Sequence, residues 1–227
     1  MYEGFAGILN LYTIPPQDGH RRDDTITSDL AKFLGHELFV TFFSFLIQNK
    51  RWNLVEKLLD EDLYARVHNY SSPEFVPYTS LCDPVSLLFH RNKRLGLQAR
   101  LLHANVLYER HTTSDLADLV PIEIFIEADY FLFQRNVLNP VTLPQWIAWR
   151  AWSTVYTKQP ARFLKEATRR EFAQQLALSL GLPDIPTLRN RLTERREALT
   201  MIWNYGFNSP WFDPNIDDFD ISTIGSS

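Results

Sequence analysis

The feature that most constrains this chain is a ten-residue apolar run, LFVTFFSFLI, at positions 38–47. It lies within a longer segment, 28–49, that we interpret as one helix. At 100° per residue, the apolar side chains of this helix point in nearly every direction, and a helix that is apolar on all sides is a buried one. The run therefore predicts a buried central helix at 28–49 that other elements surround.

The same apolar run is too short to cross a membrane, because a spanning helix needs about 20 apolar residues. Polar residues close both of its ends, with His36 and Glu37 before it and Gln48 to Lys50 after it. We therefore expect a core helix of a globular domain and no membrane partner.

The composition favours helices over sheets. Only 8 glycines occur among the 227 residues, and sandwiches or barrels need many tight turns. The chain predicts an all-α fold, an irregular multi-helix bundle of about seven to nine helices around the central helix. The further amphipathic segments lie at about 2–12, 52–67, 84–90, 94–111, 121–136, 146–156, 160–181 and 187–203.

The charge distribution divides the chain into a body and a tail. The overall net charge is −4, and the part beyond Gly206 carries no Lys or Arg but four aspartates, Asp213, Asp217, Asp218 and Asp220. The body is therefore formally neutral. We expect a single helical domain over 1–206 and an acidic, irregular and flexible C-terminal tail over 207–227. Because helix-like sequence starts at the second residue, we also expect the chain to be a fragment of a longer polypeptide.

Cysteine usage and the N-terminus indicate the compartment. The single cysteine, Cys82, excludes an internal disulfide framework and is typical of a reducing compartment. The first residues lack the basic and apolar regions of a signal peptide. We therefore expect a cytoplasmic protein in which Cys82 is a buried structural thiol.

Motifs of catalytic or cofactor-binding chemistry are absent from the sequence. The six histidines do not occur at metal-ligand spacings such as HxxxH or HExxH. Neither a GxGxxG or GxxxxGK phosphate loop nor a GxSxG nucleophile elbow is present. The sequence therefore predicts no metal ion and no cofactor, and it favours a chain that is not an enzyme.

One acidic residue conflicts with its surroundings. Asp129 falls in the middle of the apolar arc of the helix at 121–136, and a buried ionised carboxylate costs several kcal/mol unless it is paired and hydrogen-bonded. We predict a buried ion pair that fixes how this helix docks on the preceding one. The nearest partners in the sequence are on the basic flank of that preceding helix: Arg100, His103, Arg110 and His111. A rotated helix with an exposed Asp129 is the alternative.

The same residues define a second, weaker hypothesis. A carboxylate and a histidine held close together can act as a general acid–base pair. The weak candidates for such a catalytic site are Arg100, His103, His111 and Asp129.

Basic residues gather between His90 and His111 and again between Lys158 and Arg196. Tryptophans lie between these two stretches, and a basic surface with aromatic side chains can bind nucleic acid. However, Arg and Glu alternate in the last two helices, as on a solvated helix face. The neutral body also offers little counterion release. Nucleic acid is therefore an alternative partner but not the favoured one.

These observations favour a non-enzymatic helical module for interaction or sensing, an accessory domain of a larger, bacterial-type intracellular protein. Its expected partner is another protein or a neighbouring domain of the same polypeptide. The alternative is an enzyme or a nucleic-acid-acting effector with a site formed by Arg100, His103, His111 and Asp129. The sequence does not indicate the oligomeric state.

Overall fold

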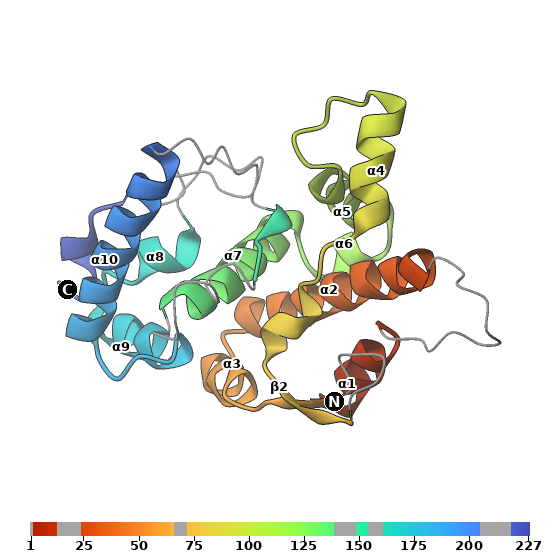
Figure 1. The fold of residues 1–227 in the computed structure, drawn as a ribbon. Coiled ribbons are helices and arrows are strands. Elements are labelled where there is room, and N and C mark those ends of the chain that lie inside the picture. Colours follow the sequence, from red (N-terminus) through yellow and green to blue (C-terminus); the bar gives the residue numbers. More distant parts are fainter. Residues whose placement is uncertain (1, 13–23, 66–71, 139–148, 154–160, 205–218) are drawn as a thin grey trace.

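The structure is a computed structural model that describes residues 2–12, 24–65, 72–138, 149–153, 161–204 and 219–227 (Figure 1). Over these ranges it contains ten α-helices, of which α6 and α8 are the shortest, and the predicted all-α multi-helix fold is confirmed. The helices are α1 (Tyr2–Asn10), α2 (Asp24–Gln48), α3 (Trp52–Leu59), α4 (Ser86–Leu95), α5 (Leu102–Thr113), α6 (Leu116–Leu119), α7 (Ile122–Leu138), α8 (Arg162–Glu166), α9 (Arg170–Ser179) and α10 (Ile185–Asn204).

A small antiparallel sheet follows α3. Its strands are β1 (Leu63–Ala65) and β2 (Glu74–Val76), and their register pairs Leu63 with Val76 and Ala65 with Glu74. The segment predicted as one helix at 52–67 is therefore a short helix and a strand.

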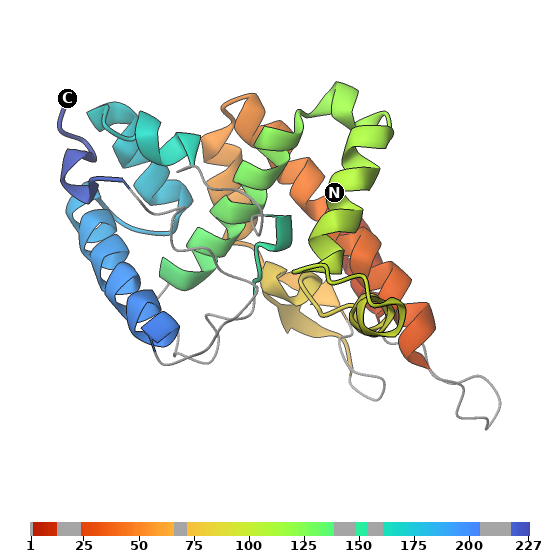
Figure 2. The ribbon, with the colours of Figure 1, turned by 90° about the horizontal axis from the view of Figure 1, so that it is seen from above.

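The long helix α2 lies at the centre, as predicted, and α7 packs across it (Figures 1 and 2). Phe39, Val40 and Phe43 of α2 are fully buried. From the side of the sheet, α1 inserts Phe5 edge-on against Phe39, with 5.0 Å between the ring centroids. Edge-to-face aromatic contacts of this kind add to the energy of burial.

One face of α2 differs from the prediction of a helix covered on every side. Leu30, Leu38 and Phe45 are 63%, 46% and 51% exposed. They lie on one side of the helix with the half-buried Leu34, at spacings of four, four and seven residues. We call these four residues the apolar stripe. It stays exposed because α1 and α7 cover other faces of α2.

By length and a mean hydropathy of 1.5, the part of α2 from Ser28 to Gln48 would suffice to cross a bilayer. However, 56% of the most apolar stretch within this segment is buried inside the protein. Such burial is typical of a core helix.

Helix α7 is buried on more sides than its sequence predicts. Opposite the apolar arc of this helix, a polar arc of Glu123, Glu127, Tyr130 and Gln134 predicts a solvent-facing side, but of these four residues only Glu123 is exposed. The reason is a second layer, α8 to α10, that covers the far side of α7 (Figure 1). Its Phe163 stacks on Tyr130 at 6.0 Å between ring centroids.

Two predicted long helices are each interrupted. The segment expected as a helix from 94 to 111 begins in α4 and continues in α5, because Gly96 takes a left-handed conformation (φ 57°) that ends α4. The segment from 160 to 181 divides into α8 and α9. The backbone carbonyls at the break, those of Ala167 and Thr168, accept hydrogen bonds from Gly225 and Ser227 at 2.7 and 3.1 Å.

The C-terminal residues 219–227 are docked, so the prediction of a flexible tail is wrong for this part of 207–227. Ile224 is fully buried, and the Arg189 guanidinium donates to the Ile224 carbonyl oxygen. Arg196 donates to the carbonyl oxygen of Phe219 at 2.8 Å. The expected domain boundary at 206 and the aspartates at 213, 217 and 218 lie outside the described residues.

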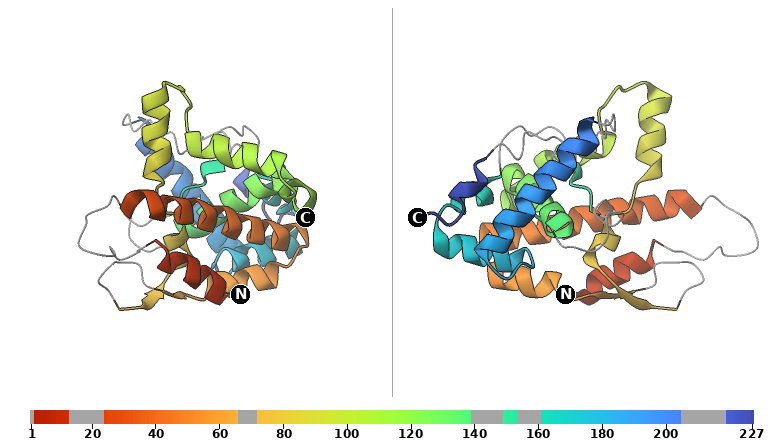
Figure 3. Two further views of the ribbon diagram at one scale, coloured as in Figure 1. Left: turned by 90° about the vertical axis from the view of Figure 1, so that its right-hand side faces the viewer. Right: turned by 60° about the vertical axis from the view of Figure 1, so that its left-hand side comes forward.

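Helix α4 and the loop that joins it to α5 project from the body as an arm (Figures 1 and 3). No residue of α4 is fully buried. The loop that joins the two helices is closed by Asn92, whose side chain donates to the Ala99 carbonyl oxygen at 2.8 Å and accepts from the Ala99 N–H at 3.2 Å. The arm is thus an ordered element that stands away from the core.

Candidate functional site

Asp129 lies where α7 meets the segment 149–153. The carboxylate is fully buried and accepts three hydrogen bonds: from the Trp149 indole at 2.9 Å, from the Ser153 backbone N–H at 2.9 Å and from the Ser153 hydroxyl at 2.7 Å. The three donors replace the hydrogen bonds to water that the carboxylate loses on burial, and they therefore stabilise it in the interior. Asp129 is therefore buried, as predicted, but its hydrogen-bond donors are Trp149 and Ser153 and not the basic residues that the sequence predicted as its partners.

The imidazole next to Asp129 comes from α2. His36 Nε2 lies 3.4 Å from Asp129 Oδ1, at ion-pair distance when the ring is protonated. The His36 ring also contacts Trp149 and Trp152, with centroid separations of 5.1 and 4.6 Å. Asp129 therefore connects α7 to α2 and to residues 149–153.

His103 lies on the other side of His36. Their ring centroids are 5.8 Å apart, and the Trp152 ring lies 3.5 Å from that of His103. Burial, and secondly the proximity of His36, lower the pKa of His103 well below its ordinary value. His103 is therefore neutral at physiological pH.

The remaining predicted residues lie elsewhere. His111 is two turns further along α5, about 12 Å from His103 at 1.5 Å per residue, where its Nε2 lies 2.6 Å from the Val120 carbonyl oxygen. Arg110 forms a bidentate ion pair with Glu37, at 2.9 and 3.0 Å. Arg100 is exposed in the arm loop. Of the predicted site residues, Arg100 and His103 thus lie together. Asp129 is separated from His103 by His36, and His111 lies further along α5, away from this cluster.

A pocket of about 250 Å³ opens at the base of the arm. We call it the arm pocket. It is lined by residues from the segments 84–92 and 100–103, together with Arg150 and Trp152. Its cationic and imidazole groups come from Arg100, Arg150, His90 and His103, and none of the lining residues in the described part of the chain is Asp or Glu.

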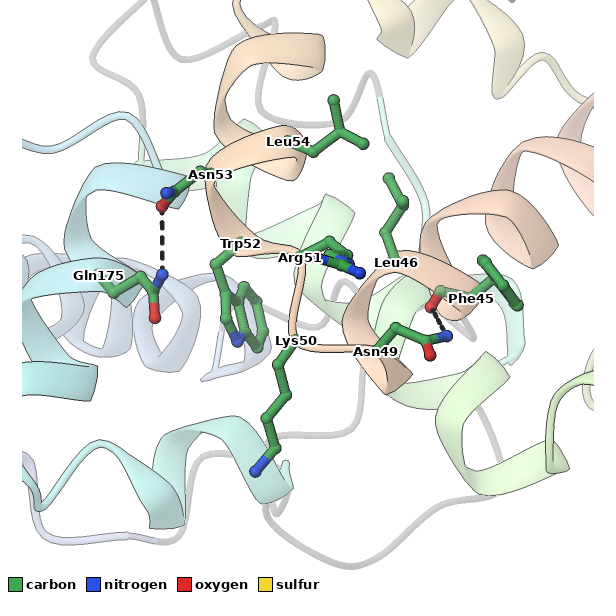
Figure 4. A pocket seen from close by; sticks show the side chains of 9 residues that line it. All are labelled: Phe45, Leu46, Asn49, Lys50, Arg51, Trp52, Asn53, Leu54 and Gln175. Atoms are coloured by element: carbon green, nitrogen blue, oxygen red, sulfur yellow. Dashed lines mark hydrogen bonds between the residues drawn. The ribbon is translucent and has the colours of Figure 1, made fainter.

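A larger and shallower groove, of about 590 Å³, lies at the turn between α2 and α3 (Figure 4). Phe45 and Trp52 give it apolar walls, and Lys50 extends from the turn beside it. Its amide side chains are engaged, since Asn53 accepts from Gln175 at 3.2 Å and Asn49 donates to the Phe45 carbonyl oxygen at 2.8 Å. We call this the turn groove. The apolar stripe of α2 runs into it, because Phe45 belongs to both.

Neither a reactive thiol nor a metal-binding cluster is present in the described part of the chain. Cys82 is buried, and desolvation raises the pKa of its thiol well above the ordinary value, so it is the inert thiol that the sequence predicts. Among the same residues, no group of three or more His, Cys, Asp or Glu side chains could hold a metal ion.

Sequence reasoning missed His36, Trp149, Trp152 and Ser153 as neighbours of Asp129. A signal was present for one of them, because His36 is a polar residue at the start of an otherwise apolar helix. Comparison of the chain with protein-family models, with curated proteins and with solved structures finds no significant match. The function is therefore inferred from the side chains themselves.

Proposed function

We propose that this chain is a non-enzymatic protein-interaction module that binds an amphipathic helix of a partner protein, or of a neighbouring domain, along the apolar stripe of α2. The single observation that carries the proposal is the exposure of Leu30, Leu38 and Phe45 on a helix whose opposite face is fully buried.

The geometry of the stripe suits a helix. From Leu30 to Phe45 it extends about 22 Å at 1.5 Å per residue, and helix-in-groove recognition uses apolar anchors at spacings of three, four and seven residues. Burying a Leu or Phe side chain fully is worth about 1.5–3 kcal/mol. Because these three anchors are already about half buried, covering them would contribute about 2–5 kcal/mol, and further contacts at the turn groove would supply the rest of the affinity.

The end of the stripe favours one orientation of the partner. Lys50 and Arg51 border the turn groove, and among the described residues no Asp or Glu lines it. A partner helix with an apolar face and an acidic residue at one end would complement both features. Nucleic acid is a less suitable partner for this surface. Charged phosphates do not pack favourably on apolar leucine side chains, and phosphate binding depends on many cationic contacts.

The experiment is a selection of binders from a displayed library of helical peptides on the wild-type chain. The matched variants are Leu38→Glu, in the stripe, and Leu119→Glu, at a 60% exposed leucine on α6. We expect selected peptides to carry apolar residues at i, i+4 and i+7 or i+8 with an acidic residue near one end. Their affinity should fall at least about tenfold for Leu38→Glu and stay unchanged for Leu119→Glu. Peptides that bind both variants equally would refute the stripe as the binding surface.

The second candidate function is the alternative that the sequence predicts, an enzyme or a nucleic-acid-acting effector. It is favoured by Arg100 and His103 lining one pocket, and disfavoured by the position of His111. A nuclease or hydrolase activity lost in His103→Gln but kept in His111→Gln would support this candidate.

A further inference from the structure

We propose that the arm pocket is a binding site for a small organic anion, in which a carboxylate or phosphate group is carried on a compact apolar or planar body. This site uses residues of the arm and of segment 149–153. It is therefore independent of the apolar stripe.

The first argument is a pair of buried nitrogen atoms. His103 and Trp152 line the arm pocket and are 4% and 1% exposed. Within the described residues, His103 Nε2 and Trp152 Nε1 have no hydrogen-bond partner. Unpaired buried polar atoms are rare and costly in folded proteins. An indole N–H can only donate, so the group that pairs with Trp152 must be an acceptor.

The second argument is the charge of the lining. Arg100 and Arg150 bring guanidinium groups to the pocket, His90 adds an imidazole, and the lining within the described ranges contains no acidic side chain. Moreover, the sequence from 84 to 108, which forms the arm and most of the pocket, contains no Asp or Glu. An acceptor that also carries negative charge fits this lining, because guanidinium groups bind carboxylate and phosphate in a planar, bidentate manner.

The third argument is the direction of α5. Its first turn, with Leu102 and His103, lines the pocket. No side-chain cap is formed by Leu101, the residue that precedes the helix. The first N–H groups of a helix have no acceptor within the helix, and they carry the positive end of its dipole. Together with the two unpaired nitrogens, this helix end favours an oxyanion.

The apolar walls define the rest of the ligand. The apolar lining consists of Phe89, Leu88, Val85 and Leu101. The pocket volume of about 250 Å³ lies just below the roughly 300–1,000 Å³ that is usual for sites of drug-sized ligands. A body of the size of one aromatic ring would therefore be accommodated against these walls. The inference is a small anion with one oxyanion group, and a dinucleotide is too large.

The test is a titration followed by NMR of the tryptophan indole N–H groups, with benzoate and phenyl phosphate as probes and benzyl alcohol as the neutral control. The signal of Trp152 is assigned by its loss in Trp152→Phe. We expect a saturable shift of this signal with benzoate, phenyl phosphate or both, which also distinguishes a carboxylate from a phosphate ligand. Benzyl alcohol should leave it unchanged.

The variants separate charge from folding. Arg100→Gln, at an exposed position, should weaken the binding of the anion by about tenfold or more. Arg91→Gln is the matched control, because it removes one charge from the same arm at a residue that does not line the pocket. The proposal is overturned if neither anion shifts the Trp152 signal. That result would mean that solvent, and not an anion, is the hydrogen-bond partner of the buried nitrogens. Equal binding of benzyl alcohol, or equal weakening by both arginine variants, would also overturn it.

Discussion

Ser153 donates two hydrogen bonds to Oδ2 of Asp129, one from its backbone N–H at 2.9 Å and one from its hydroxyl at 2.7 Å. The two residues are 24 positions apart, and the carboxylate lies in the interior of the protein. Through this pair, and through the Trp149 indole on the other carboxylate oxygen, α7 fixes the segment that brings Trp152 to the arm pocket. A buried carboxylate on α7 thus positions a wall of the candidate ligand site.

The first prediction concerns this carboxylate. Asp129→Ala should lower the free energy of unfolding by about 3–5 kcal/mol, because three donors lose their acceptor in the interior. Chemical denaturation measures the change, and Asp118→Ala, at an exposed aspartate of α6, is the control that should change little. An unaltered denaturation midpoint for Asp129→Ala would show that the buried cluster does not stabilise the fold.

The second prediction compares two glycines that both have positive φ, Gly181 at 76° and Gly96 at 57°. Gly96→Ala should cost about 1 kcal/mol, the price of a left-handed conformation in open space. Gly181→Ala should cost clearly more, because the added Cβ would collide with the buried Arg135 guanidinium, which also pairs with Asp60. Equal unfolding free energies for the two variants would contradict the close approach of Arg135.

The fold class could be predicted because it depends on local patterns. The apolar run at 38–47 and the scarcity of glycine both indicated helices around α2. Helix ends were harder, because tertiary contacts set them. The break between α8 and α9, for example, depends on Gly225 and Ser227, which lie about 60 residues further along the chain. The polar arc of α7 was misassigned for the same reason, since a second layer of helices covers Glu127 and Gln134.

The third prediction concerns the C-terminal segment, in which Ile224 is fully buried. Ile224→Ala should destabilise the protein by about 2–4 kcal/mol, the usual cost of emptying a buried isoleucine site. Ser226→Ala, at an exposed serine, should lie within about 0.5 kcal/mol of the wild type. Thermal unfolding of both variants gives the comparison, and an unchanged melting temperature for Ile224→Ala would mean that the segment does not dock in solution.

The fourth prediction is a dependence on pH. Burial raises the pKa of Glu127 above the ordinary value of 4.5, although the N–H of Phe163 donates to its carboxylate at 2.6 Å. The folded state therefore holds this proton more tightly than the unfolded state, so the wild type loses stability as the pH rises above 4.5 through the raised pKa. Glu127→Gln keeps an acceptor for Phe163 and cannot ionise.

Unfolding free energies of the wild type and Glu127→Gln, measured from pH 4 to pH 8, test this dependence. The advantage of the glutamine variant should grow with pH above 4.5 and then become constant. A difference that is flat, or that shrinks as the pH rises, would contradict the burial of an ionisable Glu127.

The candidate site could be predicted only in part. The apolar neighbours of Asp129 in the sequence indicated its burial, because helical periodicity is local. Its partners could not be predicted, since His36, Trp149 and Ser153 are distant in sequence and meet only when α2 packs on α7. Arg100 and His103 were singled out as partners of Asp129. The structure places them instead at the arm pocket, which forms only when α4 stands beside the start of α5.

We propose that the exposed stripe of α2 binds a partner helix and that its exposed side chains contribute little to the stability of the fold. The most direct measurement is the unfolding free energy of Leu38→Glu beside its affinity for a helical peptide selected on the wild type. We predict a stability within about 0.5 kcal/mol of the wild type, as for an exposed position, and an affinity at least about tenfold lower. A variant that binds the peptide as tightly as the wild type, or one that unfolds as a core variant would, contradicts the claim.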